Sequence, residues 1–143
     1  MLKRSFLAAV LLVSLTGAGQ AADAGPWLGT WALRDEDAGG QPETLVYSDA
    51  GAGAMRMESV EARSVIITHF DGQPVPDSGP TNSGNALAVT ATSPRSYTWI
   101  FWTGGAPFVQ GVNTLAEDGR SFTEISWRID RPERRVTLIY ERQ

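Results

Sequence analysis

The stretch Trp27-Leu28-Gly29-Thr30-Trp31-Ala32-Leu33 decides the fold that we expect for this chain of 143 residues. Its largest side chains fall on alternate positions, with Gly29 between Trp27 and Trp31. A period of two is typical of a β-strand with one buried face. Gly29 has no Cβ, so another part of the chain can approach the backbone closely there. We therefore expect the fold to open with a strand whose Trp31 is buried.

Further β-strands follow this opening, divided by clusters of Gly, Pro and Asp. We predict strands over residues 27–34, 44–48, 55–58, 63–70, 87–91, 96–102, 108–115, 122–129 and 135–140. These segments recur about every ten to twelve residues, a spacing typical of a β-sandwich or a barrel. Because the connections are short, an antiparallel up-and-down β-barrel of eight or nine strands is favoured, which also removes exposed sheet edges.

One segment does not fit the strand pattern. Residues 73–85 contain three Pro residues, and each Pro removes a hydrogen-bond donor from a sheet. The sequence excludes a central strand there and predicts a loop near the mouth of the barrel, where long loops often line an opening.

The residues before Trp27 predict an export signal. Lys3 and Arg4 precede an apolar run over residues 6–15, and residues 19–21 (Gly-Gln-Ala) form a small-x-small cleavage site. The run is shorter than the roughly 20 residues of a membrane-spanning helix. We predict a signal peptide over residues 1–21 and one mature domain over residues 22–143, located in a bacterial periplasm or secreted. The absence of Cys suits a bacterial periplasm.

Charge and composition exclude several functions. The predicted mature chain keeps ten basic residues, all Arg, against 16 acidic ones, which argues against nonspecific binding to nucleic acid or to anionic membrane. With no Lys, Schiff-base chemistry on a Lys is excluded. No nucleophile elbow, phosphate-binding loop or dinucleotide fingerprint is present. We predict no cofactor.

Two groups of residues offer weak alternatives to a noncatalytic protein. His69, the single His, shares a strand face with Asp71, so an acid–base pair is conceivable. A zinc site needs three or four ligands, and this pair supplies two. The run Asp35-Glu36-Asp37 offers oxygen ligands but lacks the pattern of a calcium loop, so we interpret it as a solvated loop. We predict no catalytic residue and no metal site.

Four motifs resemble those of a known group of proteins. Residues 27–33 resemble the aromatic-x-Gly-Thr-Trp-x-Leu opening of lipocalins and fatty-acid-binding proteins. Residues 71–79 match Asp-Gly-x-x-x-Pro-x-x-Gly, residues 118–123 match Asp-Gly-Lys/Arg-x-hydrophobic-Thr, and residues 138–143 resemble Val-x-Tyr-Glu-Lys/Arg-Gln. In this order they are similar to small exported bacterial proteins of lipocalin-like type. The resemblance implies a lipocalin-like barrel with Gly29 and Trp31 at its floor, and an Arg packed over that Trp, either Arg142 or, second, Arg34.

The aromatic residues and methionines suggest what the barrel does. Tyr97, Trp99 and Phe101 share one face of the most aromatic segment, although either face could point inward. With a barrel of this size, the interior is either filled or holds one small ligand. Our leading hypothesis is noncatalytic binding of a small apolar or amphipathic molecule. The predicted lining is Tyr97, Trp99, Phe101, Trp127, Met55 and Met57.

The alternative hypothesis is an envelope structural or interaction protein. In that case the barrel core is filled, and the protein acts through a surface aromatic patch around Trp102, which lies on the opposite face from Trp99. A cavity of about 300 Å³ or more would favour the ligand hypothesis.

Overall fold

The computed structural model describes residues 23–143, so the predicted signal peptide lies outside the described residues. These residues form ten β-strands after a short 3-10 turn, η1 (Gly25–Trp27). The strands are β1 (Gly29–Leu33), β2 (Thr44–Gly51), β3 (Ala54–Ser59), β4 (Ser64–Thr68), β5 (Asp71–Pro76), β6 (Asn85–Ser93), β7 (Ser96–Thr103), β8 (Ala106–Leu115), β9 (Ser121–Arg128) and β10 (Arg135–Arg142).

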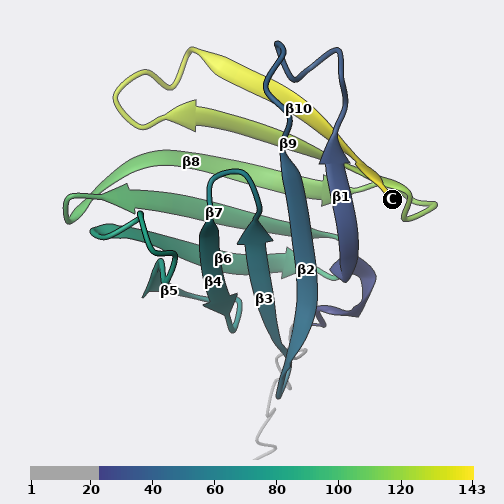
Figure 1. Cartoon of the computed structure of the whole chain (residues 1–143), viewed down its shortest axis with the longest axis horizontal. Helices are drawn as coiled ribbons and strands as arrows, with labels where there is room; N and C mark the ends of the chain where they lie inside the picture. The colour runs from purple at the N-terminus through teal and green to yellow at the C-terminus, as the bar shows by residue number, and fades with distance from the viewer. Residues whose placement is uncertain (1–22) are drawn as a thin grey trace, which may run out of the picture.

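All ten strands belong to one antiparallel sheet, in the order β4-β3-β2-β1-β10-β9-β8-β7-β6-β5. Neighbouring strands are consecutive in the chain, with one exception: β1, the first strand, pairs with β10, the last. The sheet curls so that β4 and β5, at its two ends, come close together (Figure 1). The predicted all-β, up-and-down barrel is therefore confirmed, with one strand more than the upper expected number.

The barrel is nearly closed, and a loop bridges the seam between β4 and β5. The Val65 amide and the Ser64 hydroxyl donate hydrogen bonds to the two carboxylate oxygens of Asp77, at 2.9 and 2.6 Å. The Ser78 amide donates to the carbonyl oxygen of Val65 at 3.0 Å. The edge groups of β4 thus find partners without a continuous ladder, as buried backbone groups must.

Two segments differ from the sequence-based expectation. Residues 73–76, predicted as part of the loop over 73–85, belong to β5. Pro74 and Pro76 are tolerated because β5 is an edge strand, where a missing donor breaks no ladder. Trp27, predicted to begin the first strand, instead ends η1, because Pro26 suits the start of a helical turn.

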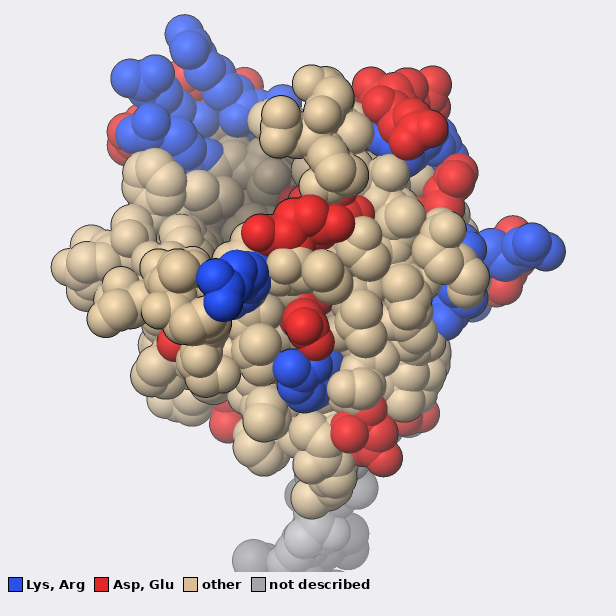
Figure 2. All heavy atoms as spheres, in the orientation of Figure 1, with Lys and Arg blue, Asp and Glu red and all other residues tan. Residues whose placement is uncertain are grey.

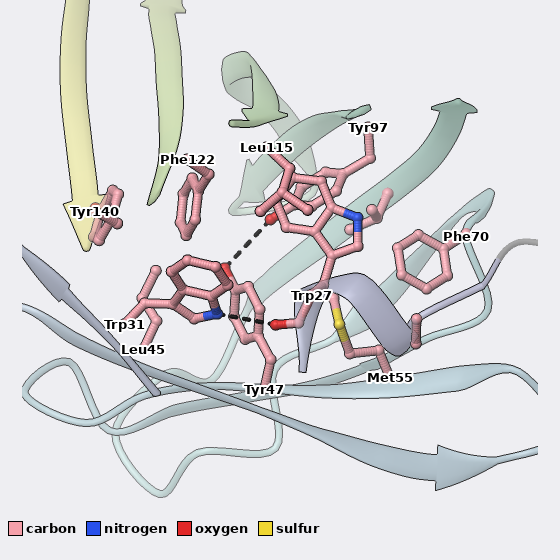
Figure 3. Packing of buried hydrophobic residues seen from close by; sticks show 12 residues of the cluster. Trp27, Trp31, Leu45, Tyr47, Met55, Phe70, Tyr97, Leu115, Phe122 and Tyr140 are labelled. Carbon is pink, nitrogen blue, oxygen red and sulfur yellow. Dashed lines mark hydrogen bonds between the residues drawn. The ribbon is translucent and has the colours of Figure 1, made fainter. Parts of the chain in front are cut away.

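Aromatic side chains fill the barrel at the end where η1 lies (Figure 3). Trp27 and Trp31 are almost entirely buried, and the indole nitrogen of Trp31 donates to the carbonyl oxygen of Trp27 at 2.9 Å. Phe122 contacts both indoles edge-on, with ring centres 5.7 and 5.0 Å away. Edge-to-face packing adds to the stabilisation that burial alone gives. The η1 turn acts as a plug.

Arg142 closes the floor beneath this cluster. Its guanidinium carbon lies 4.1 Å from the centre of the Trp31 ring. Its three nitrogens donate to the carbonyl oxygens of Leu28, Pro26 and Gly119, at 2.5, 2.9 and 2.8 Å. Each bond is charge-assisted, and together they tie β10, η1 and the β8–β9 turn into one unit.

Gly29 makes room for that guanidinium. Its φ of 139° is a conformation that other residues rarely adopt, and a Cβ there would lie 2.5 Å from Nη1 of Arg142. Arg34, the second expected partner of Trp31, instead bonds Glu36 and Glu141 on the surface. The resemblance implied Arg142 first and Arg34 second, and Arg142 is the one over Trp31.

Candidate ligand cavity

A cavity of about 230 Å³ lies inside the barrel, beyond the aromatic core. It is larger than the roughly 150 Å³ cavity that binds benzene in an engineered core, and smaller than the roughly 300–1,000 Å³ of sites for drug-sized ligands. The barrel is thus neither filled nor hollow enough for a large ligand. Every strand except β1 and β5 contributes to the lining. The lining residues are Glu43, Leu45, Tyr47, Met57, Glu58, Ser59, Ser64, Ile66, Leu87, Tyr97, Trp99, Asn113, Glu124, Leu138 and Tyr140.

Trp99 forms one wall because the strand opposite it leaves space. Trp99 on β7 is the register partner of Gly111 on β8. A Cβ at Gly111 would lie 2.6 Å from the indole, so only Gly lets the ring lie against the β8 backbone. The indole nitrogen then donates to Oδ1 of Asn113, two residues further along β8, at 2.8 Å. The face of β7 that carries Tyr97 and Trp99 therefore points inward.

A polar network extends from Trp99 across the base of the cavity. Nδ2 of Asn113 donates to the hydroxyl of Tyr97 at 2.9 Å, and that hydroxyl lies 3.3 Å from the hydroxyl of Tyr47 (Figure 3). Asn113 is almost completely buried, and this network satisfies both ends of its amide. Burial raises the pKa of Tyr97 and of Tyr47, so both hydroxyls stay neutral and available for hydrogen bonding.

Three carboxyl groups line the same cavity, and one of them, Glu58, pairs with Arg56. Glu124 on β9 is the register partner of Asn113, and burial together with the negative charge of Glu43 raises the pKa of Glu124 to about 7. A hydrogen bond from Asn113 acts in the opposite direction. Glu43, just before β2, accepts from the Tyr140 hydroxyl at 2.7 Å and from the Ser59 hydroxyl at 3.4 Å. Within residues 23–143, neither Glu43 nor Glu124 takes part in an ion pair.

Basic side chains gather at one place on the outer surface, the β9–β10 hairpin (Figure 2). Figure 2 shows a hollow in the face that it presents, with acidic side chains at one edge and a group of basic ones over the β9–β10 hairpin. That basic group is the hairpin Arg cluster: Arg128, Arg131, Arg134 and Arg135, all exposed and none lining the cavity.

The predicted lining residues are only partly brought together. Tyr97, Trp99 and Met57 line the cavity, whereas Met55 is fully buried and belongs to the core cluster. Phe101 shares the inward face of β7 but does not line the cavity.

Trp127 lies on the outer face of β9. Phe122 and Glu124 point inward, so strand alternation turns Trp127 outward, where the guanidinium of Arg135 covers its ring at 4.1 Å. The aromatic character of this residue suggested an inward position, but the alternation of β9 decides otherwise.

The polar half of the site was missed by the sequence analysis. Glu43, Asn113 and Glu124 come from three separate parts of the chain and meet only through the closed sheet. One sequence feature pointed to Glu124: it lies two residues after Phe122, on the same face of a predicted strand. A charged residue in phase with a core aromatic residue is unusual and is a candidate for function.

The other candidate residues lie away from the cavity. His69 and Asp71 are exposed at the β4–β5 connection. In the part of the chain that the structure describes, no group of three or more His, Asp or Glu residues is arranged to hold a metal ion. Trp102 is half-buried, and its indole nitrogen is enclosed without a hydrogen-bond partner among the described residues. Residues 23–143 contain no helix with the length and apolar character needed to cross a bilayer.

Comparison with known proteins adds no identity to this geometry. No protein-family model matches the chain, and no curated protein matches it.

Proposed function

We propose that this protein is an exported, noncatalytic binding protein that holds one small organic molecule in its barrel. The cavity of about 230 Å³ is below the roughly 300 Å³ set above for the ligand hypothesis, so its volume alone does not favour binding. The observation that supports this proposal is its lining, with aromatic walls and a buried polar network at its base. Most ligand sites have this composition: a mainly apolar lining with a few well-placed polar groups. The lipocalin-like motifs of the sequence and the export signal predicted over residues 1–21 support the same function.

The groups in the cavity are suited to hold a ligand. The Tyr hydroxyls, the Asn113 amide and the Trp99 indole already bond one another, so they are fixed in position before a ligand enters. A preformed network lowers the entropy lost on binding. The interaction alternative depended on an exposed Trp102, which is half-buried, and so we place the function in the cavity.

Native mass spectrometry of the purified protein, with calorimetric titration of aromatic molecules slightly larger than benzene, tests this proposal. Leu138 lines the cavity, so Leu138→Trp should fill it and abolish binding. Val136 is on the same face of β10 but is 53% exposed and outside the cavity, so Val136→Trp is the matched control and should bind normally. If the wild type binds no probe, or if Leu138→Trp binds as well as the wild type, the proposal fails.

A further inference from the structure

We infer that the cavity selects a small organic cation, an ammonium group on an aromatic or short alkyl body, with Glu124 as its counter-ion. This inference rests on the proposed function and names the ligand class. Two independent features of the cavity carry it: the aromatic rings of its walls, and a carboxyl group without a cation.

The walls provide aromatic faces for a positive charge. Four aromatic side chains, Tyr47, Tyr97, Trp99 and Tyr140, line a cavity only slightly larger than a benzene site. A cation within about 6 Å of an aromatic face is attracted by the ring, most strongly when both are removed from water. A molecule that fills this cavity must lie against several of these rings. The walls alone would accept a neutral molecule, but they favour a cation.

The carboxyl groups determine the sign of the charge. Glu124 and Glu43 both border the cavity, and residues 23–143 supply neither with an ion-pair partner. Glu43 accepts hydrogen bonds from the hydroxyls of Tyr140 and Ser59. Among the described residues, Glu124 interacts favourably only with the side-chain amide of Asn113, its register partner on β8. Glu124 is half-buried, and a carboxylate partly removed from water without a cation is costly. A bound ammonium would remove that cost, and an anion would increase it.

Other sources of positive charge do not meet Glu124. Arg56, which precedes the lining residue Met57 in the sequence, pairs with Glu58 at 2.5 Å. The hairpin Arg cluster is exposed to solvent, where salt screens charges over about 10 Å. No group of three or more acidic or His side chains among the described residues could hold a metal ion, so the carboxylates fit a bulky organic cation better.

Such binding depends on pH in a definite direction. The pKa of Glu124 is about 7 without ligand, and the ammonium requires the ionised form. The charged and titratable groups that line the cavity with Glu124 are Glu43, Glu58 with its partner Arg56, and the tyrosines of β2, β7 and β10. The tyrosines stay neutral because burial raises their pKa. Affinity should therefore fall about tenfold between pH 8 and pH 6, as the ionised fraction falls.

Three probes of nearly equal shape test the inference: 2-phenylethylammonium, 2-phenylethanol and phenylacetate, titrated by calorimetry at pH 8 and pH 6. At pH 8 we expect the ammonium to bind at least about tenfold more tightly than the alcohol, and the carboxylate least tightly. Glu124→Gln should remove this preference and the pH dependence. Glu141→Gln makes the same change at an exposed carboxylate that pairs with Arg34 outside the cavity, and both effects should remain.

The outcomes separate this inference from the proposed function. If the alcohol or the carboxylate binds the wild type as tightly as the ammonium does, the cavity binds ligands but the cation inference is wrong. If the preference persists in Glu124→Gln, another group provides the charge, and the assignment to Glu124 is wrong. If none of the three binds, the proposed function fails, and this inference fails with it.

Discussion

The two ends of this barrel hold a half-buried charge in opposite ways. At the floor, Arg142 lies over the Trp31 ring and donates to three carbonyl oxygens. In the cavity, Glu124 lies among aromatic side chains without a cation. A charge with all its hydrogen bonds made stabilises the structure around it, whereas one without them destabilises it. The floor therefore stabilises the fold, whereas the cavity lacks a cation to pair with Glu124.

The largest effect should come from removing the centre of the floor. Trp31→Ala deletes a fully buried side chain, and large-to-small changes of this kind cost about 3–5 kcal/mol. Urea unfolding followed by far-UV circular dichroism measures the loss without depending on tryptophan fluorescence. A cost below about 1 kcal/mol would mean that the floor is not the stable end.

The next effect concerns the guanidinium above that ring. Arg142→Met keeps an apolar stem but leaves three carbonyl oxygens without their donor, so we expect a loss of about 3 kcal/mol in the free energy of unfolding. Arg34→Met is the control, because Arg34 makes only surface ion pairs, each worth about 0–1 kcal/mol. Equal losses in the two variants would contradict the role given to Arg142.

The cavity should respond to pH where the floor does not. Because the pKa of Glu124 is raised from 4.5 to about 7 by folding, the folded state binds its proton more tightly. Its contribution to stability is complete below pH 4.5 and is lost as pH rises to 7, by up to about 3 kcal/mol. Glu124→Gln lacks this loss, so the variant should gain on the wild type between pH 4.5 and pH 8. Denaturant unfolding at both pH values measures the gain.

Asp130→Asn is the control for that experiment, since the hydrogen bond from Arg128 lowers the pKa of Asp130, the opposite direction. It should show no such gain as pH rises. If the stability difference between the wild type and Glu124→Gln is the same at both pH values, folding does not raise the pKa of Glu124.

The smallest effect is expected on the outer wall. Trp127→Ala removes a Trp from the outer face of β9 and its contact with Arg135, so the cost should stay below about 1 kcal/mol, with ligand binding unchanged. Thermal unfolding and the titrations described above check both statements. Loss of binding in this variant would return Trp127 to the ligand site, where the sequence had predicted it.

The fold could be predicted from the sequence because its determinants are local. Alternation within each strand and the Gly and Asp turns between strands are visible without knowing what pairs with what. The strand β5 was not predicted, because it contains Pro74 and Pro76. Pro is excluded from a central strand but is tolerated in an edge strand such as β5. Whether a strand lies at an edge is a property of the whole sheet.

The site was less predictable because it depends on contacts between distant segments. Trp99 and Trp127 both lie on alternating, aromatic strands, and the sequence gives no sign that one points inward and the other outward. That difference depends on which face meets the core, where Phe122 packs against Trp31. Glu43, Asn113 and Glu124 likewise converge only once the barrel has closed.

The floor has a consequence for how a newly made chain assembles. Its register pairs Trp31 with Arg142, so the plug needs both the first and the last strand. Contacts between residues far apart in the chain form late, because a long loop must close first. During synthesis, β2 to β9 can form neighbouring hairpins, but their apolar faces stay open to water until β10 arrives. The last strand to be made is therefore the one that seals the molecule.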